Sequence, residues 1–316
     1  MKSACKSLKL KQLSLVSLAL GMSLFSTFVP ASYAETNCDA IQVTGHRGES
    51  SSDRTENTYR SLDFAAANGA DGVEFDIRLS KDRQWVLMHD ASVRRTTNGR
   101  GYVSKRYAST ITGRYLTDDS RVVGMRLHAP LLSTVMNGTD LQQGLAQKYP
   151  GLRYQIEFKP SSRATVNDVA AALNIITATA PESQLVVTST STSMLEKVHA
   201  ARPSITRAYI SLTSPVSPAI LPTLQTLGIQ YANVGYNSID NDFVNQAHSL
   251  GLSVTVRGPA DPTQWLYALS LNPDNLVVDQ PSKFVAWCKD YISNPPSPLR
   301  VAKPSLSVSR SYVQPD

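Results

Sequence analysis

The chain has 316 residues, 41% of them hydrophobic, and a formal net charge of +6. This length and apolar content predict a globular protein with a sizeable core, built as one large α/β domain or two ordinary ones. The charge does not indicate a nucleic-acid partner.

The first 34 residues have the pattern of a secretory signal peptide. Four lysines precede an apolar run from Leu13 to Val29, and small residues follow at Ser32-Tyr33-Ala34. An uncleaved membrane anchor is the alternative, although the run is shorter than the ~20 residues of a full span. Removal of the segment would lower the charge from +6 to +2, because it holds four lysines and no acidic residue. We expect a soluble protein exported to the periplasm or the medium, with no stable membrane span after signal cleavage and an oligomeric state that the sequence leaves open.

Two of the three cysteines remain after the predicted cleavage, Cys38 and Cys288. They flank almost the whole predicted domain. An even pair in an oxidising compartment favours a disulfide. We expect these two residues to join the start of the domain to its end.

Short apolar runs, separated by helix-length segments, recur along the chain after residue 40. The eight predicted strands cover residues 41–45, 72–79, 154–158, 184–188, 206–210, 230–234, 252–256 and 275–279. Amphipathic stretches lie between most of them, for example at 56–68, 165–179, 194–201 and 242–250. Eight β/α repeats over about 250 residues predict a (β/α)8 TIM barrel over residues 35–288. An open, doubly wound sheet is the structural alternative.

Three segments depart from the β/α rhythm. The apolar run 84–90 follows the second strand so closely that it must be a hairpin partner or an extension near the barrel rim. An insertion after this second strand region, residues 91–128, has weak periodicity, and a long loop on a barrel usually covers the active face. Residues 289–316 are rich in proline and serine and predict a poorly ordered tail.

Acidic residues alternate with apolar ones in the second predicted strand. The alternation in 73–78 turns Glu74, Asp76 and Arg78 to one face. Two carboxylates inside a barrel would repel each other, and a divalent cation between them would relieve the repulsion. The third strand repeats the pattern with Glu157 and Lys159, which makes Glu157 a candidate third ligand. Oxygen ligands suit Mg²⁺ or Ca²⁺ better than zinc; a solvated strand face with basic partners is the alternative.

Two histidines lie at predicted strand ends, where a barrel presents its working groups. His46 follows the first strand and His89 ends the run 84–90. A pair of histidines can divide the roles of base or nucleophile and general acid. The adjacent Arg47 offers a fork of donors to a phosphate or carboxylate. Together with the acidic residues, these groups favour the cleavage of a phosphate ester.

The motifs also carry a family resemblance between about residues 41 and 285. The chain contains, in order, GHRG, ENT, GADGVEFDIRLSKDRQWVLMHD, RRTTNGRG, APLL, IEFK and LVVDQPSKF. This ordered set resembles the glycerophosphodiester phosphodiesterase family. The resemblance implies a TIM barrel, one divalent cation (Ca²⁺ or Mg²⁺), and hydrolysis of glycerophosphodiesters to glycerol 3-phosphate and an alcohol. On matching positions it implies an acid/base pair (His46, His89), metal ligands (Glu74, Asp76, Glu157) and groups near the phosphate (Arg47, Lys159), with the insertion helping to enclose the glycerol end.

Three further residues are candidate members of the site. Glu56 and Asn57, in the motif ENT, are expected to support the site, but Glu56 also has the capping-box spacing from Asp53. Arg257 occupies the approximate place where family members often carry a tryptophan. It could favour a more anionic substrate end, or it could pair with nearby Asp261 or Asp279.

Two other functions fit the same scaffold. One is a phospholipase D-like enzyme that acts on lysophospholipid or sphingolipid and forms a cyclic phosphate. No amphipathic membrane-binding helix stands out in the sequence, which disfavours this reading. The other is a binding protein without catalytic activity. The presence of both histidines and all three acidic residues favours an enzyme that takes a small-molecule phosphodiester.

Overall fold

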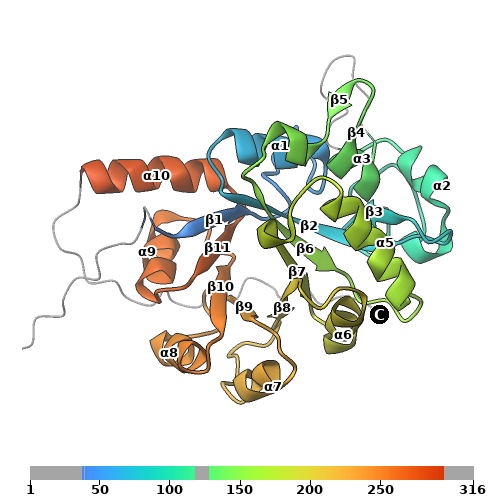
Figure 1. The fold of residues 1–316 in the computed structure, drawn as a ribbon. Coiled ribbons are helices and arrows are strands. Elements are labelled where there is room, and N and C mark those ends of the chain that lie inside the picture. Colours follow the sequence, from blue (N-terminus) through green and yellow to red (C-terminus); the bar gives the residue numbers. More distant parts are fainter. Residues whose placement is uncertain (1–37, 39, 118–127, 295–316) are drawn as a thin grey trace, which may run out of the picture. The chain divides into compact units, whose positions relative to one another are not determined.

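Eight parallel strands form a closed barrel in the part of the chain that the structure describes. The computed structural model describes residue 38 and residues 40–117 and 128–294, so the predicted signal peptide lies outside it. Each barrel strand pairs with the next one along the chain, and the last pairs with the first (Figure 1). The predicted TIM barrel is confirmed, and the open doubly wound alternative is wrong. The barrel strands are β1 (Gln42–Gly45), β2 (Gly72–Leu79), β6 (Arg153–Phe158), β7 (Leu185–Ser189), β8 (Thr206–Ile210), β9 (Tyr231–Gly235), β10 (Ser253–Arg257) and β11 (Asn275–Val278).

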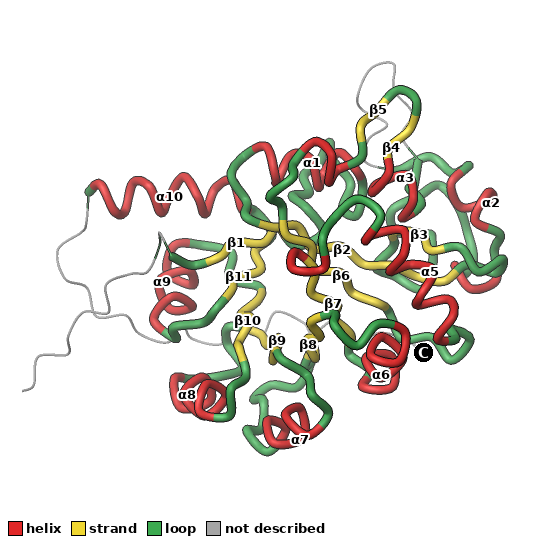
Figure 2. Tube along the Cα trace, in the orientation of Figure 1, coloured by secondary structure: helices red, strands yellow, loops and turns green. Residues whose placement is uncertain are grey.

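Helices connect the strands and lie outside the barrel (Figure 2). Five of them begin at a Ser, Thr or Asp side chain that accepts a hydrogen bond from a backbone N–H of the first turn. None of the helices in the described ranges has the length and hydropathy of a transmembrane span. The α-helices are α1 (Tyr59–Ala67), α2 (Ala108–Thr112), α3 (Leu132–Asn137), α4 (Leu145–Lys148), α5 (Val166–Thr177), α6 (Thr192–Ala201), α7 (Ile220–Thr226), α8 (Asn241–Ser249), α9 (Pro262–Ser270) and α10 (Pro281–Ser293), with 3-10 turns at Val103–Lys105 and Glu182–Gln184.

The core lies between the strands and the surrounding helices. The apolar residues of β2 are fully buried in it: Val73, Phe75 and Ile77 have no exposed surface. Because side chains alternate along a strand, Glu74 and Asp76 point the other way, into the barrel. The packing of these apolar side chains therefore determines which face carries the acidic residues.

The run after the second strand is its hairpin partner, the first of the two predicted alternatives. Strand β3 (Trp85–Leu87) pairs antiparallel with β2, with Leu87 opposite Ile77. The described part of the insertion packs on β3 and has a small apolar core of its own, made by Val86, Met88, Val93, Val103, Ile111, Leu116 and Ala129. Beyond it, β4 (Gly138–Thr139) and β5 (Gln142–Gln143) form a short separate hairpin.

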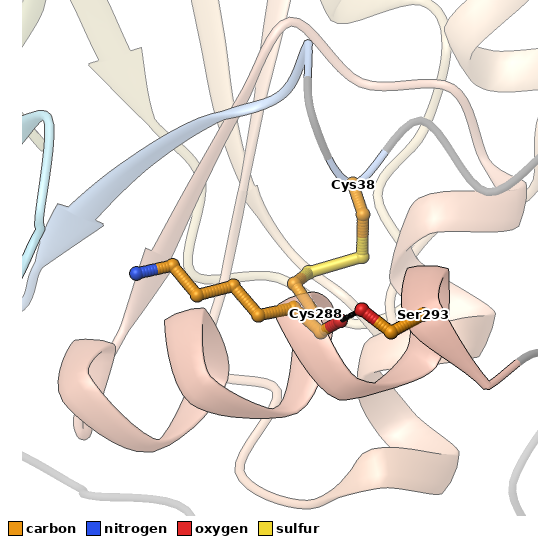
Figure 3. Close-up of a disulfide and its surroundings, with 4 residues drawn as sticks. Cys38, Cys288 and Ser293 are labelled. Atoms are coloured by element: carbon orange, nitrogen blue, oxygen red, sulfur yellow. Dashed lines mark hydrogen bonds between the residues drawn. A yellow bond between two sulfur atoms is a disulfide. The ribbon is translucent and has the colours of Figure 1, made fainter.

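The domain continues past residue 288, so the expected start of the tail at Lys289 is wrong. Helix α10 extends to Ser293, and the half-buried ring of Tyr291 near its end lies 5.1 Å from the ring of Trp287. Residues 295–316 lie outside the described part. Figure 3 shows the bond between Cys38 and Cys288, with Ser293 at the end of the same helix. The Cα atoms of the two cysteines are 5.6 Å apart.

Candidate active site

A pocket of about 540 Å³ opens at the carboxyl ends of the barrel strands. Most of the predicted site residues line it, although they come from strands far apart in the sequence. Asp76 and Asn57 lie behind the lining. Asp76 forms ion pairs with Arg47 and Lys159, and the backbone N–H of Asn57 donates to the carbonyl oxygen of Arg47. The predicted site residues that line the pocket are His46, Arg47, Glu56, Glu74, His89, Glu157, Lys159 and Arg257.

Three carboxylates meet at the floor of this pocket. Each of Glu74, Asp76 and Glu157 offers an oxygen that lies within 4.8 Å of the other two, and all three residues are at most 8% exposed. Strands β2 and β6 place them together because Asp76 lies opposite Glu157 in the parallel register. Burial, followed by the charge of Asp76, raises the pKa of Glu74, and burial also raises the pKa of Glu157. Burial and the neighbouring carboxylates thus disfavour the ionised forms of Glu74 and Glu157.

Two basic side chains partly balance this charge. Lys159 Nζ lies 2.8 Å from Asp76 Oδ1 and 2.8 Å from Glu157 Oε1, and Arg47 Nε lies 3.3 Å from Asp76 Oδ2. Burial opposes the ionisation of Asp76, but Lys159 and Arg47 outweigh it and lower the pKa of this carboxyl. No described cation lies within ion-pairing distance of Glu74, whose Oε2 accepts a hydrogen bond of 2.8 Å from the backbone N–H of Arg47.

The donor set fits a hard divalent cation. The three ligands are all carboxylate oxygens, which Ca²⁺ and Mg²⁺ prefer, and no cysteine or histidine belongs to the cluster among the described residues. The raised pKa values of Glu74 and Glu157 also indicate that one further positive charge would favour their ionised forms. Glu74, Asp76 and Glu157 could therefore hold one such ion.

The two predicted histidines lie on the same pocket, and each is held by a carboxylate. Nδ1 of His46 donates to Asp279 over 2.6 Å, and Nδ1 of His89 donates to Asp90 over 2.7 Å. This leaves Nε2 of each ring for proton exchange. Burial opposes protonation of His46, but the hydrogen bond to Asp279 outweighs it and raises its pKa. Burial, with Lys159 and Arg47 nearby, lowers the pKa of His89 to about 4.

Sequence reasoning did not assign these two carboxylates to the histidines, although a signal for each was present. Asp90 directly follows His89. Asp279 follows the last strand, which is the neighbour of the first strand in any closed barrel. The histidine at the end of the first strand and a carboxylate at the end of the last strand are therefore expected to be close.

Glu56 contacts the site and does not cap the helix, so the capping-box interpretation of Asp53 and Glu56 is wrong. Helix α1 begins at Tyr59, and its capping box joins Thr58 to Ser61. The Glu56 carboxylate instead accepts hydrogen bonds from Arg47 (3.0 Å) and from both terminal nitrogens of Arg95 (2.7 Å each).

Asn57 binds both the side chain and the backbone of Asp76, a predicted metal ligand. Its Nδ2 donates to Asp76 Oδ2 over 2.7 Å, and its Oδ1 accepts from the backbone N–H of Asp76 over 2.9 Å. The backbone of Asn57 is left-handed, with φ 55°, a conformation that asparagine tolerates better than most residues. The sequence placed Asn57 near the site, and the structure identifies the residue that it contacts.

The two glycines around His46 allow close packing of the chain on itself. A Cβ on Gly48, where φ is +79°, would lie 2.3 Å from the backbone of Ser61 in α1, and one on Gly45 would lie 2.9 Å from Ala65 Cβ. Both residues thus let helix α1 approach the loop that carries His46. This is a different role from the phosphate access that glycines give in many phosphate-binding loops.

Arg257 pairs with neither of the two expected acidic residues. Asp261 caps helix α9 and Asp279 binds His46. Arg257 Nη2 instead donates to the carbonyl oxygen of Ser211 over 2.5 Å. The ion-pair interpretation is therefore wrong, and Arg257 lies in the wall of the pocket.

The fold and the pocket define a (β/α)8-barrel protein in which two histidines and a buried cluster of three carboxylates share one site. Residues 46–283 match the model of the Glycerophosphoryl diester phosphodiesterase family. This match covers well over half of the chain, and the protein belongs to that family.

Similar proteins share either a local sequence or the whole fold. The glycerophosphodiester phosphodiesterase of Caldanaerobacter subterraneus is 48% identical over 61 residues, which is 19% of this chain and 25% of the relative. Human glycerophosphodiester phosphodiesterase 1 is 51% identical over 63 residues, 20% of this chain and 19% of the relative. The aligned part of the chain thus spans about a quarter or less of these relatives.

Solved structures match over most of the barrel. A phosphodiesterase from Oleispira antarctica, in complex with the product sn-glycerol-3-phosphate, has a TM-score of 0.68 and 24% identity, and the match covers 81% of this chain and 99% of that one. A glycerophosphodiester phosphodiesterase from Agrobacterium tumefaciens has a TM-score of 0.61 and 21% identity over 78% and 99% of the two chains. At this identity the two structures support the shared fold.

Proposed function

We propose that the protein hydrolyses glycerophosphodiesters to glycerol 3-phosphate and an alcohol, with one bound divalent cation, Ca²⁺ or Mg²⁺. The observation that carries the proposal is the pocket in which two carboxylate-held histidines accompany three buried carboxylates. Membership of the family supports this reaction, and the complex of the Oleispira antarctica relative with sn-glycerol-3-phosphate supports the same product.

The histidines supply the proton transfers of this reaction. Hydrolysis breaks the bond between phosphorus and the alcohol oxygen and forms a bond between phosphorus and the oxygen of water. One proton is removed from the attacking water, and one is added to the leaving oxygen. Nε2 of His46 and Nε2 of His89 are available for these two transfers, because Asp279 and Asp90 occupy Nδ1.

The charged side chains stabilise the phosphate during the reaction. Arg47 and Lys159 line the pocket and place positive charge beside it. A divalent cation held by Glu74, Asp76 and Glu157 would neutralise the charge that develops on the phosphate oxygens. Asn57 keeps Asp76 in position by its two hydrogen bonds.

We also propose that the protein works outside the cytoplasm. The signal-peptide pattern of residues 1–34 supports export. The Cys38–Cys288 bond supports an oxidising compartment.

Product analysis tests the reaction and the cation. The purified protein is incubated with glycerophosphocholine in the presence of Ca²⁺, Mg²⁺ or a chelator, and glycerol 3-phosphate and choline are measured. Turnover that needs the cation is expected, and chelator-insensitive turnover would contradict the metal assignment. A parallel incubation with lysophosphatidylcholine tests the phospholipase D-like alternative, which requires choline release from that lipid. Absence of turnover with any phosphodiester would favour a binding protein.

Histidine variants test the acid/base pair. His46→Ala and His89→Ala are each expected to lower kcat by about 10²- to 10⁴-fold, the usual contribution of general acid or base catalysis. His199→Ala is the matched control, because His199 is exposed in the last turn of α6. Full activity of either site variant would contradict the pair.

A further inference from the structure

One wall of the pocket contains two buried polar atoms without a hydrogen-bond partner. They are Asn233 Oδ1 and Arg257 Nε. Asn233 is 1% exposed and lies in β9, and Arg257 is the last residue of the adjacent strand β10. Both residues line the same pocket as the histidines and the acidic cluster. Buried polar atoms are usually paired, and a ligand in this pocket could supply a partner to this donor and this acceptor.

The guanidinium of Arg257 is held in place by a neutral partner. Its Nη2 donates to the Ser211 carbonyl, which orients the group without neutralising it. No described carboxylate lies within ion-pairing distance of Arg257. Burial lowers the pKa of Arg257. The more distant carboxylates of Glu157 and Glu74 oppose this shift, and the positive charge of Arg47 adds to it. Arg257 therefore brings to the pocket a positive charge that no described carboxylate pairs with directly.

The substrate class limits where a matching negative charge can be. A glycerophosphodiester has one negative charge on its phosphate, and its glycerol part has none. A second anionic group must therefore belong to the alcohol. A guanidinium recognises a carboxylate or a phosphate with two parallel hydrogen bonds, and the amide oxygen of Asn233 accepts from a hydroxyl or ammonium group.

We propose that this wall, formed by Arg257 and Asn233, selects glycerophosphodiesters whose alcohol carries an anionic group beside a hydrogen-bond donor. An amino-acid alcohol such as serine has both features, with its carboxylate for Arg257 and its ammonium for Asn233. Ethanolamine has the ammonium alone. This inference rests on the proposed hydrolysis and adds its substrate preference.

The test compares two substrates that differ by one carboxylate. Values of kcat/KM are measured for glycerophosphoserine and glycerophosphoethanolamine at the same cation concentration. The protein is expected to prefer the serine compound by about tenfold or more, through a lower KM, which is the usual effect of a hydrogen bond to a charged group. A second pair, glycerophosphoinositol with and without a phosphate on the ring, shows whether a phosphate serves as well as a carboxylate.

Variants show whether Arg257 is responsible. Arg257→Gln is expected to lower the serine-to-ethanolamine ratio by about tenfold, and Arg257→Lys, which keeps the charge but not the fork, by less. Lys197→Gln is the matched control, because it removes the same charge from the outer helix α6 and should keep the ratio of the unmodified protein.

Several outcomes would overturn the inference. A ratio of one or less in the unmodified protein contradicts it without any variant. An equal loss for both substrates in Arg257→Gln would show that Arg257 contacts the shared glycerophosphate part. Turnover without preference would contradict only this inference, whereas no turnover of any glycerophosphodiester would contradict the proposed function as well.

Discussion

Arg95 connects the insertion to both sides of the candidate site. Its guanidinium binds Glu56 through two nitrogens and Asp90 through Nε at 2.7 Å. Glu56 also binds Arg47, and Asp90 holds His89. A single side chain therefore positions both Glu56, the partner of Arg47, and Asp90, the partner of His89. Groups of this kind commonly change activity by 10- to 100-fold without touching the substrate.

Arg94, next to Arg95 in the sequence, provides a control for the positioning role of Arg95. Arg95→Gln is expected to lower kcat by about 10- to 100-fold and to change KM less, because it loosens His89 without removing it. Arg94→Gln removes the same charge from an exposed side chain that makes no hydrogen bond to a described residue, and should match the unmodified protein. Steady-state kinetics of the two variants check the prediction. Equal kinetics would mean that the Arg95 contacts are dispensable.

At the residue scale, periodicity predicted the carboxylates that strands carry, whereas it gave no role to Arg95 in the insertion. Glu74, Asp76 and Glu157 could be predicted because strand alternation fixes their face and parallel register brings them together. Arg95 could not, because its contacts span 39 residues between two irregular segments. No periodicity describes such a contact.

At the scale of elements, Asp168 links helix α5 to the β2–β3 hairpin by hydrogen bonds. Its carboxylate accepts from the backbone N–H of Thr165 over 2.6 Å and from Arg83 Nε over 2.7 Å. Its carbonyl oxygen accepts from Trp85 Nε1 over 2.8 Å. Burial opposes the ionisation of Asp168, but the hydrogen bonds from Thr165 and Arg83 outweigh it and lower its pKa.

Removal of this charge should destabilise the protein in a pH-dependent way. Asp168→Asn is expected to lower the free energy of unfolding at pH 7 by about 1.5–3 kcal/mol, the range for hydrogen bonds to a charged group. Because the pKa is lower in the folded state, the contribution is complete above the usual ~3.9 of an unfolded aspartate and is lost as pH falls through the folded value. Urea unfolding from pH 7 to pH 3 should show the difference shrinking. Asp242→Asn, in the exposed first turn of α8, is the control and should change little at either pH.

The boundaries of elements were less predictable than their existence. All eight barrel strands overlap their predicted ranges. Helix α1 starts at Tyr59 because two capping patterns overlap in one segment, and the arginine contacts of Glu56 decide between them. Helix α10 runs to Ser293 because its aromatic face continues beyond Cys288, whereas the composition of the following residues suggested an earlier end. In both cases tertiary contacts determine the boundary.

At the scale of the whole domain, the Cys38–Cys288 bond closes a loop of 250 residues. Loops of this length lose much conformational entropy in the unfolded state when they are cross-linked. The double variant Cys38→Ser/Cys288→Ser is expected to lower the free energy of unfolding by about 2–5 kcal/mol. Denaturation with and without reductant measures it: reductant should destabilise the unmodified protein and leave the double variant unchanged. Equal stability of the oxidised protein and the variant would contradict the prediction.

The number and order of the apolar runs predicted the barrel, but closure itself is a property of the assembled chain. Strand β1 pairs with β2 over two residue positions and with β11 over four. The sequence contains no local signal for that last pairing. The pairing arises because each of the eight twisted strands must form hydrogen bonds to a neighbour on both of its edges.

The pairing of β1 with β11 predicts the order in which turnover, cation binding and helical structure are lost on heating. The bond from His46 to Asp279 crosses the junction of β1 and β11, while the three clustered carboxylates all lie on β2 and β6. Detachment of β11 and α10 would therefore leave the cation ligands together and release one imidazole from its support. In the reduced protein, we expect turnover to be lost at the lowest temperature. Cation binding should be lost at a higher temperature, and most of the helical circular-dichroism signal at a higher temperature still. We therefore expect loss of the β1–β11 pairing to end catalysis before the three carboxylates separate.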